Sequence, residues 1–272
     1  MLAKRLLVAA ILLPIGVAAI WLGGWYLTVL VALFMGAAAW EYVNLFKLAG
    51  LHPGLILVVG GTLLLLVGRT VNGFDSAGWM ISLIVLLSMT YHLVSYERGR
   101  DQAGTDFAVS LAGIFYIGWL GAYFISLRGL PDGQWWVLVV LAGVMLADSG
   151  AYFIGRRFGR HKLSPRLSPK KTWEGYFGGI LLGVPLTTLF ALLFQHFAGP
   201  AAGITPVKGA LVGLVMAVLP TLGDLGESMV KRQAGVKDSG NILPGHGGAF
   251  DRIDAWLWAV AIGYYLVLFL QL

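Results

Sequence analysis

Carboxylates and basic side chains crowd a short segment near the end of this sequence. The stretch KDSGNILPGHGGAFDRID, residues 237–254, places three Asp, two basic residues and one His among four Gly. A long apolar run follows from Ala255. Ionisable side chains beside an apolar run of membrane-spanning length are costly, so they are candidates for a functional site.

The carboxylates in and near this stretch have helical spacing. Asp224 and Glu227 are three residues apart, and they share one face if a helix continues through them. Asp224 also lies at the end of an apolar run, behind Pro220 and Gly223, which favour a break in the helix. An acid at that depth in a membrane is a candidate functional residue.

Asp251 and Asp254 repeat the same spacing at the start of the last apolar run. Asp254 suits the N-terminal end of that helix, where a carboxylate can cap free amides. A helix start in which Asp251, Arg252 and Asp254 pair with one another in solvent is an equally simple interpretation. Carboxylates that bind a hard divalent ion, beside a Gly-rich loop and basic residues, are typical of a phosphate–Mg²⁺ site and favour the functional interpretation.

The loop between these carboxylates is rich in glycine. Gly245, Gly247 and Gly248 surround His246, so the backbone there can adopt positive φ and present its amides to an anion. His246 can donate to a phosphate oxygen or brace the loop, and the sequence alone does not decide between these roles.

A second polar segment, ADSGAYFIGRRFGRHKLSPRLSPKKTWEG, carries the opposite charge. Asp148 lies in an apolar run, where it either serves a site or pairs with an Arg of another helix. Within SPKKTWEG, Ser168 is expected to cap a helix. Lys170 and Lys171 would then lie near a positive helix end that receives phosphates.

The composition identifies the kind of protein that must position these residues. The 272 residues are 58% hydrophobic and 12% charged, and the mean hydropathy is +0.81. Soluble domains are about 25% charged, so this is a polytopic membrane protein. The net charge of +6 fits cytoplasmic loops and anionic lipid better than nucleic acid, and the lack of cysteine excludes disulfides and thiolate metal sites.

The apolar runs predict an all-α fold of about nine transmembrane helices, without an internal repeat. The first run is read as a span and not as a cleaved signal peptide, because it lacks a convincing cleavage site. The predicted spans are 6–23, 26–46, 54–70, 77–95, 107–127, 135–155, 176–197, 207–225 and 255–271.

The basic residues predict the orientation of these helices. With the N-terminus in the cytoplasm and the C-terminus on the opposite side, 16 of the 19 Lys and Arg fall on cytoplasmic segments. The two long polar connections, 156–173 and 226–254, then both face the cytoplasm. We therefore expect N-terminal transmembrane helices over 1–130 and a catalytic membrane region over 131–272. Carboxylates for a metal and cations for phosphates on one membrane face indicate phosphoryl or nucleotidyl transfer from a soluble nucleotide to a membrane-borne acceptor.

The segment SMVKRQAGVKDSGNILPGHGGAFDRID resembles the signature of the phosphatidate cytidylyltransferases, also called CDP-diacylglycerol synthases. The motifs ADSGAYFIGRRFGR and SPKKTWEG are similar to that family as well. One departure is Ala249, where the family has a larger aliphatic residue, at a position expected to pack and not to react. The matching positions are Ser228, Lys231, Arg232, Lys237, Asp238, Gly240, Leu243, Pro244, His246, Gly247, Gly248, Asp251, Arg252 and Asp254.

The resemblance implies that CTP and phosphatidate in the bilayer give CDP-diacylglycerol and pyrophosphate, for phospholipid biosynthesis, with Mg²⁺ and room for a second cation. It implies metal ligation by Asp224, Asp251 and Asp254. The residues expected to act in the transfer are Asp224, Asp251, Lys231, Arg232 and His246. Those expected to bind the substrates are Asp148, Ser168, Lys170, Lys171, Lys237, Gly247, Gly248 and Arg252.

The same interpretation predicts an integral protein of the inner membrane in a bacterial host, with its site facing the cytoplasm. Such a protein would contact membrane lipids and could form a homodimer.

Three alternatives to this function remain. Another CTP-using lipid enzyme, such as a polyprenol kinase, would need the same side chains. A secondary transporter would use Asp148 and Asp224 as ion sites but predicts a repeat. A passive scaffold would leave the charged signature unexplained.

Overall fold

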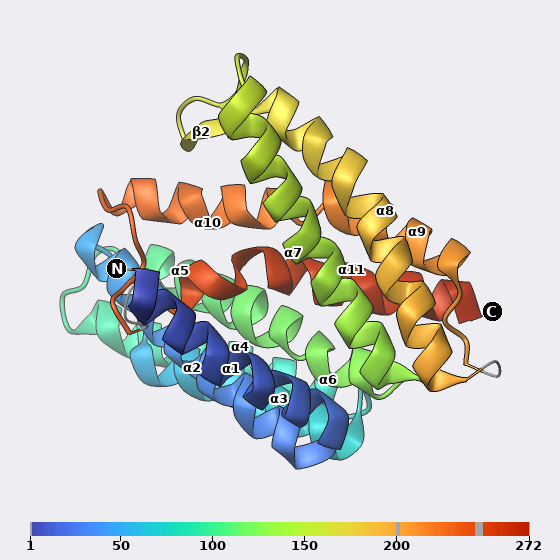
Figure 1. Ribbon diagram of the computed structural model, residues 1–272. Helices are drawn as coiled ribbons and strands as arrows, with labels where there is room; N and C mark the ends of the chain where they lie inside the picture. Colours follow the sequence, from blue (N-terminus) through green and yellow to red (C-terminus); the bar gives the residue numbers. More distant parts are fainter. Residues whose placement is uncertain (1, 200–201, 243–246, 272) are drawn as a thin grey trace. The chain divides into compact units, whose positions relative to one another are not determined.

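The computed structural model describes residues 2–199, 202–242 and 247–271, and the side chains from Ala10 onward. Helices make up nearly all of it, as Figure 1 shows. In chain order the elements are α1 (Leu2–Leu22), α2 (Gly24–Leu48), α3 (Leu55–Asn72), α4 (Ala77–Glu97), α5 (Ala103–Gly113), the π-helix η1 (Ile114–Trp119), α6 (Tyr123–Arg128), α7 (Gly133–Phe158), β1 (Lys162–Ser164), β2 (Ser168–Thr172), α8 (Trp173–Ala198), α9 (Pro206–Val218), α10 (Thr221–Gln233) and α11 (Phe250–Gln271).

The helices confirm the predicted apolar runs. Each run corresponds to one helix or, for 107–127 and 207–225, to consecutive helices. The predicted break near Pro220 is also confirmed, because α9 ends at Val218 and α10 begins at Thr221. Proline has no backbone N–H to continue the helical ladder, which explains the interruption.

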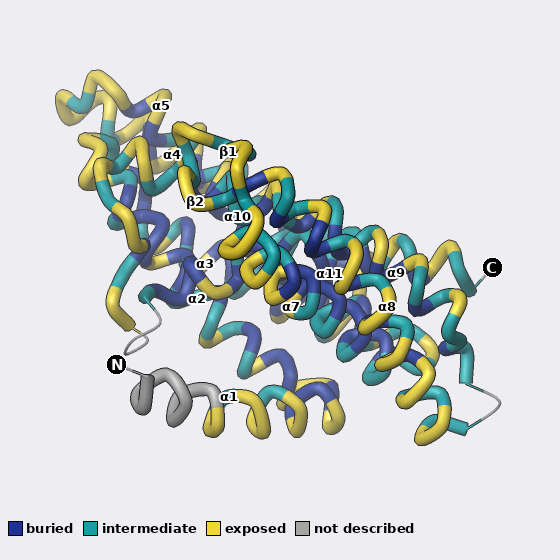
Figure 2. The backbone as a smooth tube through the Cα atoms, turned by 45° about the horizontal axis from the view of Figure 1, so that its top comes forward, coloured by how far each residue is buried: buried dark blue, intermediate teal, exposed yellow. Residues whose placement is uncertain are grey.

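The length and surface of the helices identify a multi-pass membrane protein. Among the described residues, eight helices are long and apolar enough to cross a bilayer, and the apolar helix Ala10–Leu22 is shorter. Large apolar side chains remain exposed on them, including Leu33, Leu86 and Leu181, which are 66%, 66% and 70% exposed. Figure 2 shows such exposed and half-exposed positions along α8. Surfaces of this kind on long helices face lipid.

Two compact units make up the chain. One contains Met1–Ser126 and Val230–Ile253, and the other contains Leu127–Met229 and Asp254–Leu272. The segment that carries much of the predicted signature therefore packs with the N-terminal helices.

In the first unit, α3 packs against α2, α4 and η1, and α4 packs against α5. An ion pair secures the connection between α4 and α5, where Arg100 Nε lies 2.7 Å from Asp106 Oδ2. Asp106 is buried and also accepts a bond from the backbone N–H of His52 at 2.7 Å. The hydrogen bond to Asp106 raises the pKa of the Arg100 guanidinium above its ordinary value, so this pair stays charged.

The second unit is built on the pair α7 and α8, which lie side by side (Figure 1) and both pack against α9. Glycines let the two helices approach closely. A Cβ atom on Gly179 would lie 2.8 Å from the carbonyl oxygen of Ala147, and one on Gly183 would lie 3.0 Å from the Cα of Ala147. Small residues at such contacts are typical of helix packing in membranes.

The connection between α7 and α8 is an antiparallel hairpin and not the predicted helix start. Ser168 begins β2 and pairs with Ser164 of β1, so the expectation that Ser168 caps a helix is wrong. The cap is Thr172, whose Oγ1 accepts a bond from the N–H of Gly175 at 3.2 Å. Pro169 is compatible with this arrangement, because a two-stranded sheet consists of edge strands, on which proline is tolerated.

Candidate active site

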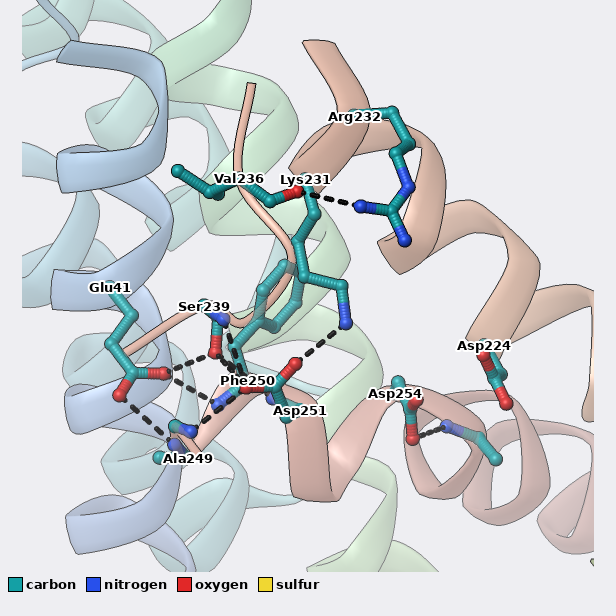
Figure 3. A network of polar contacts seen from close by, with 12 residues as sticks. Glu41, Asp224, Lys231, Arg232, Val236, Ser239, Ala249, Phe250, Asp251 and Asp254 are labelled. Atoms are coloured by element: carbon teal, nitrogen blue, oxygen red, sulfur yellow. Dashed lines mark hydrogen bonds and ion pairs between the residues drawn. The ribbon is translucent and has the colours of Figure 1, made fainter. Parts of the chain in front are cut away.

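Asp251 is the centre of a polar network in the first unit (Figure 3). Its Oδ1 lies 2.6 Å from Nζ of Lys231, and both side chains are nearly buried. Its Oδ2 accepts bonds from the N–H of Ser239 and the N–H of Gly248, both at 2.9 Å, and lies 3.0 Å from the Ser239 hydroxyl. A buried carboxylate with this many donors is held in one orientation.

Glu41 of α2 completes the network, and sequence reasoning missed it. Its Oε1 accepts a bond from the N–H of Ala249 at 3.1 Å, and its Oε2 accepts bonds from the N–H of Phe250 and the hydroxyl of Ser239, both at 2.9 Å. The Glu41 side chain is 0% exposed. The only sequence signal was an acid inside the apolar run 26–46, which is itself a reason to suspect a functional role.

The glycines of the loop permit this contact. A Cβ on Gly248 would lie 2.2 Å from Glu41 Oε2, and one on Gly240 would lie 2.4 Å from Glu41 Oε1. Gly247 has a φ of +84°, which confirms the predicted positive φ in this loop. Ala249 is 2% exposed, as expected for a packing position.

The loop amides serve the chain's own carboxylates. The N–H groups of Gly248, Ala249 and Phe250 bind Asp251 or Glu41. The expectation that loop amides bind a phosphate concerned Gly245, Gly247 and Gly248; of these, the Gly248 N–H is bonded to Asp251, and substrate binding by Gly247 and Gly248 stays a prediction. His246 lies outside the described residues, so its role stays a prediction.

The start of α11 also differs from expectation. The helix begins at Phe250, and Asp254 lies in its second turn, where Oδ1 accepts a bond from the N–H of Ala255 at 2.7 Å. Asp254 therefore does not cap the helix end. Glu41, which comes from a distant part of the sequence, satisfies amides at that end instead, so the helix can begin several residues earlier than the apolar run.

The second unit holds another group of charges, formed by Asp148 of α7, Lys171 of β2 and Asp224 of α10. Lys171 Nζ lies 2.6 Å from Asp224 Oδ2, and both side chains are partly exposed. Asp148 is close enough to interact electrostatically with both of them. The sequence predicted each residue as a candidate, and the structure brings the three together.

A small pocket adjoins this group. Asp148, Tyr176, Pro220 and Thr221 are among its lining residues, and its volume is about 10 Å³. That is about the least space that holds one water molecule. The pocket therefore suits a water or a single ion and is too small for a nucleotide.

The donor set of the second unit fits Mg²⁺. This ion binds one or two protein carboxylates together with waters and substrate phosphates. Asp148 and Asp224 provide two such carboxylates around one ammonium group. Within the described ranges there is no group of three or more His, Cys, Asp or Glu arranged to hold a metal.

Asp254 and Asp251, the other two predicted metal ligands, have different surroundings. A Cβ on Gly223 would lie 2.5 Å from the carbonyl oxygen of Asp254, so the first turn of α10 packs directly on α11 beside Asp224. Asp251 is already bonded to Lys231, Ser239 and Gly248. Metal ligation by Asp254 and Asp251 stays a prediction.

The remaining basic candidates are exposed, and Glu227 is buried. Lys170, Lys237 and Arg252 are exposed. Arg232 donates from Nη1 to the carbonyl oxygen of Val236 at 3.1 Å. Glu227 continues α10 three residues after Asp224, as predicted, and is buried.

Comparisons with known proteins agree on one family. The model of a family described as "Cytidylyltransferase family" matches residues 3–270. A phosphatidate cytidylyltransferase of Bacillus subtilis (strain 168) is 38% identical, over 88% of each chain. One of Synechocystis sp. is 31% identical over 98% of this chain and 97% of its own. One of Staphylococcus epidermidis is 36% identical over 95% of this chain and 96% of its own.

Proposed function

Because this chain belongs to the cytidylyltransferase family, we propose that it transfers the cytidylyl group of CTP to phosphatidate. The products are CDP-diacylglycerol, a precursor for phospholipid biosynthesis, and pyrophosphate. The observation that carries the proposal is the extent of the match, which covers residues 3–270. The name phosphatidate cytidylyltransferase, shared by the relatives in Bacillus subtilis and Synechocystis, identifies the acceptor.

The chemistry needs positioning and charge more than a strong base. The phosphate monoester of phosphatidate is already an anion near neutral pH. One of its oxygens attacks the α-phosphorus of CTP, a new P–O bond forms, and the bond between the α-phosphorus and the bridging oxygen of pyrophosphate breaks. The protein must align these groups and balance the negative charge that gathers at the leaving group.

Two lysines provide positive charge for this purpose. Lys171 lies beside Asp224 and Asp148 in one unit, and Lys231 lies beside Asp251 in the other. In the proposal, Lys171 binds phosphate oxygens of CTP, and Lys231 offsets the charge that develops on the leaving pyrophosphate in the transition state. Their carboxylate partners hold the ammonium groups in place before the substrate binds. Lys170, Lys237, Arg232 and Arg252 add positive charge for the approach of CTP.

The proposed cofactor is Mg²⁺, with Asp224 as a principal ligand and Asp148 as its neighbour in the second unit. When bound there, the ion would supply charge neutralisation for the phosphates of CTP. Asp148 lines the small pocket, on a helix that packs closely against α8, and Asp224 provides a second carboxylate bonded to Lys171. The proposed roles of Asp251 and Asp254 as further ligands, and a second cation, belong to the same hypothesis.

The proposed location is the cytoplasmic membrane of a bacterial cell, with the site on the cytoplasmic side, where CTP is present. The acyl chains of phosphatidate remain in the bilayer and only the headgroup enters the polar site. A homodimer stays a prediction.

An acceptor comparison tests the proposed reaction. Purified protein in detergent micelles is given CTP and Mg²⁺ with phosphatidate, diacylglycerol or a polyprenol, and the lipid products are identified by mass spectrometry. The proposal predicts CDP-diacylglycerol and an equal amount of pyrophosphate with phosphatidate alone. A phosphorylated polyprenol together with CDP would identify a lipid kinase and contradict it.

A further inference from the structure

Two segments far apart in the sequence meet at one buried carboxylate. Glu41 of α2 accepts bonds from Ser239, Ala249 and Phe250, which lie about 200 residues later in the chain. We propose that Glu41 is a positioning residue for cytidylyl transfer: through Ser239 and the start of α11, it holds Asp251 and Lys231 in their reactive geometry. This inference rests on the proposed function, since Asp251 and Lys231 are the residues it positions.

Three donors surround the two oxygen atoms of Glu41. Oε1 receives one N–H, and Oε2 receives one N–H and one hydroxyl. A carboxylate accepts on both oxygens, whereas an amide of the same shape accepts on one and donates on the other. In either orientation, a Gln side chain at position 41 would therefore set its NH₂ group against a backbone N–H, that of Ala249 or that of Phe250. The site therefore requires a carboxylate. Burying a charged carboxylate costs free energy that an apolar residue would not, so its presence here favours a functional role.

The hydroxyl of Ser239 connects the two acids Glu41 and Asp251. It donates to Glu41 at 2.9 Å and lies 3.0 Å from Asp251 Oδ2, and it accepts from the N–H of Asp251 at 3.2 Å. Because Asp251 in turn binds Lys231 at 2.6 Å, a continuous chain of bonds runs from α2 to Lys231 (Figure 3). A displacement of the Glu41 side chain would therefore also displace Asp251 and Lys231.

The loop also packs tightly around the Glu41 carboxylate. Gly240 and Gly248 flank the carboxylate so closely that a Cβ at either position would lie within 2.4 Å of it. Tyr42, the next residue of α2, places its ring edge-on to Phe250 at 6.1 Å between centroids. The loop is thus fitted to the end of one Glu side chain, and the shorter Asp would not reach the three donors together.

The test compares Glu41→Gln, Ser239→Ala and the double variant in the full-length protein. Positioning residues affect the transition state more than substrate binding, so kcat should fall roughly 10- to 100-fold in each single variant. The KM values for CTP and phosphatidate should stay within about twofold. The double variant should be little worse than either single variant, because both break the same chain of bonds.

Asp106→Asn is the matched control. Asp106 is another buried acid of the same unit, bound to Arg100 and to the N–H of His52 but not to the signature loop. This variant should lower thermal stability and leave kcat per folded molecule unchanged. If Glu41→Gln behaves like Asp106→Asn, or if its effect on kcat simply adds to that of Ser239→Ala, the proposal is overturned.

A second route covers the case in which Glu41→Gln does not fold. Ser239→Ala must then lose kcat, and Ser239→Thr, which keeps the hydroxyl, must restore much of it; a normal kcat in Ser239→Ala overturns the proposal. Hydrogen exchange at residues 247–251 gives a readout independent of catalysis and should be faster in Ser239→Ala. Wild-type protein without cytidylyl transfer would refute the proposed function itself, whereas unchanged exchange in the variant would refute the role of this network.

Discussion

Lys171 Nζ lies 2.6 Å from Asp224 Oδ2, which ties the second strand of the hairpin to the first turn of α10. Asp148 interacts electrostatically with both residues from α7. Two carboxylates thus lie close to one ammonium group, beside a pocket of about 10 Å³ that Asp148 lines. Lys171 already has a carboxylate partner, which it can exchange for a phosphate when a metal–nucleotide complex arrives.

Loss of the charge on Lys171 should weaken nucleotide binding. In Lys171→Gln, the phosphates of CTP lose an ammonium partner, so the KM for CTP should rise about tenfold while the protein remains folded. Lys162→Gln, which removes an exposed charge from the other strand of the hairpin, is the control and should leave the KM nearly unchanged. Steady-state kinetics at varied CTP decide the matter, and equal KM values in the two variants would contradict the assignment.

Removal of the Asp224 charge should change the metal requirement. Asp224→Asn keeps the size of the side chain but weakens its binding to a hard cation, so kcat should fall roughly 100-fold and half-maximal activity should need more Mg²⁺. EDTA should abolish activity of the wild type, and added Mg²⁺ should restore it. Initial rates over a range of Mg²⁺ concentrations provide the measurement, with the exposed Asp75→Asn as control. A variant with wild-type rates would remove Asp224 from the site.

A side chain at Gly248 should disturb the network around Glu41. The Cβ of Gly248→Ala would lie 2.2 Å from Glu41 Oε2 and from the Ser239 hydroxyl, so overpacking should cost about 1–3 kcal/mol of stability. Gly104→Ala, in α5, meets nothing within 4 Å and should be neutral or slightly stabilising. Thermal unfolding in micelles compares the two. Similar melting temperatures would mean that the loop does not press on Glu41.

The orientation can be tested because the sequence contains no cysteine. Single cysteines introduced as Lys162→Cys and Asp75→Cys should react with a membrane-impermeant maleimide from opposite sides of the membrane. In intact cells, with the outer membrane permeabilised where there is one, only the cysteine at position 75 should be labelled if the hairpin is cytoplasmic. If only position 162 were labelled, the hairpin would lie outside the cytoplasm. That result would contradict a site that faces the cytoplasmic CTP.

Sequence reasoning predicted the local features well. The nine runs and the break near Pro220 follow from hydropathy and from the missing N–H of proline, which act over a few residues. The same reasoning failed at Ser168, because Ser-Pro is compatible both with a helix start and with an edge strand, and strand pairing with Ser164 decided between them.

Long-range contacts could not be predicted from local pattern. The glycine loop was expected to bind a phosphate through its amides, yet these amides bind Asp251 and Glu41. Nothing near residue 248 in the sequence indicates that the loop amides will bind an acid from α2 in place of a phosphate. The grouping of Asp148, Lys171 and Asp224 was foreseen only as a list of candidates, since their meeting depends on how α7, the hairpin and α10 pack.

The most direct test of the central claim is the fate of the phosphates of CTP. Purified protein with phosphatidate and Mg²⁺ is supplied in parallel with CTP labelled at the α- or the γ-phosphorus, and the label is followed into lipid and pyrophosphate. Cytidylyl transfer predicts α-label in the lipid and γ-label only in pyrophosphate. Label from the γ-phosphorus in any lipid, or no transfer by folded protein, would contradict it.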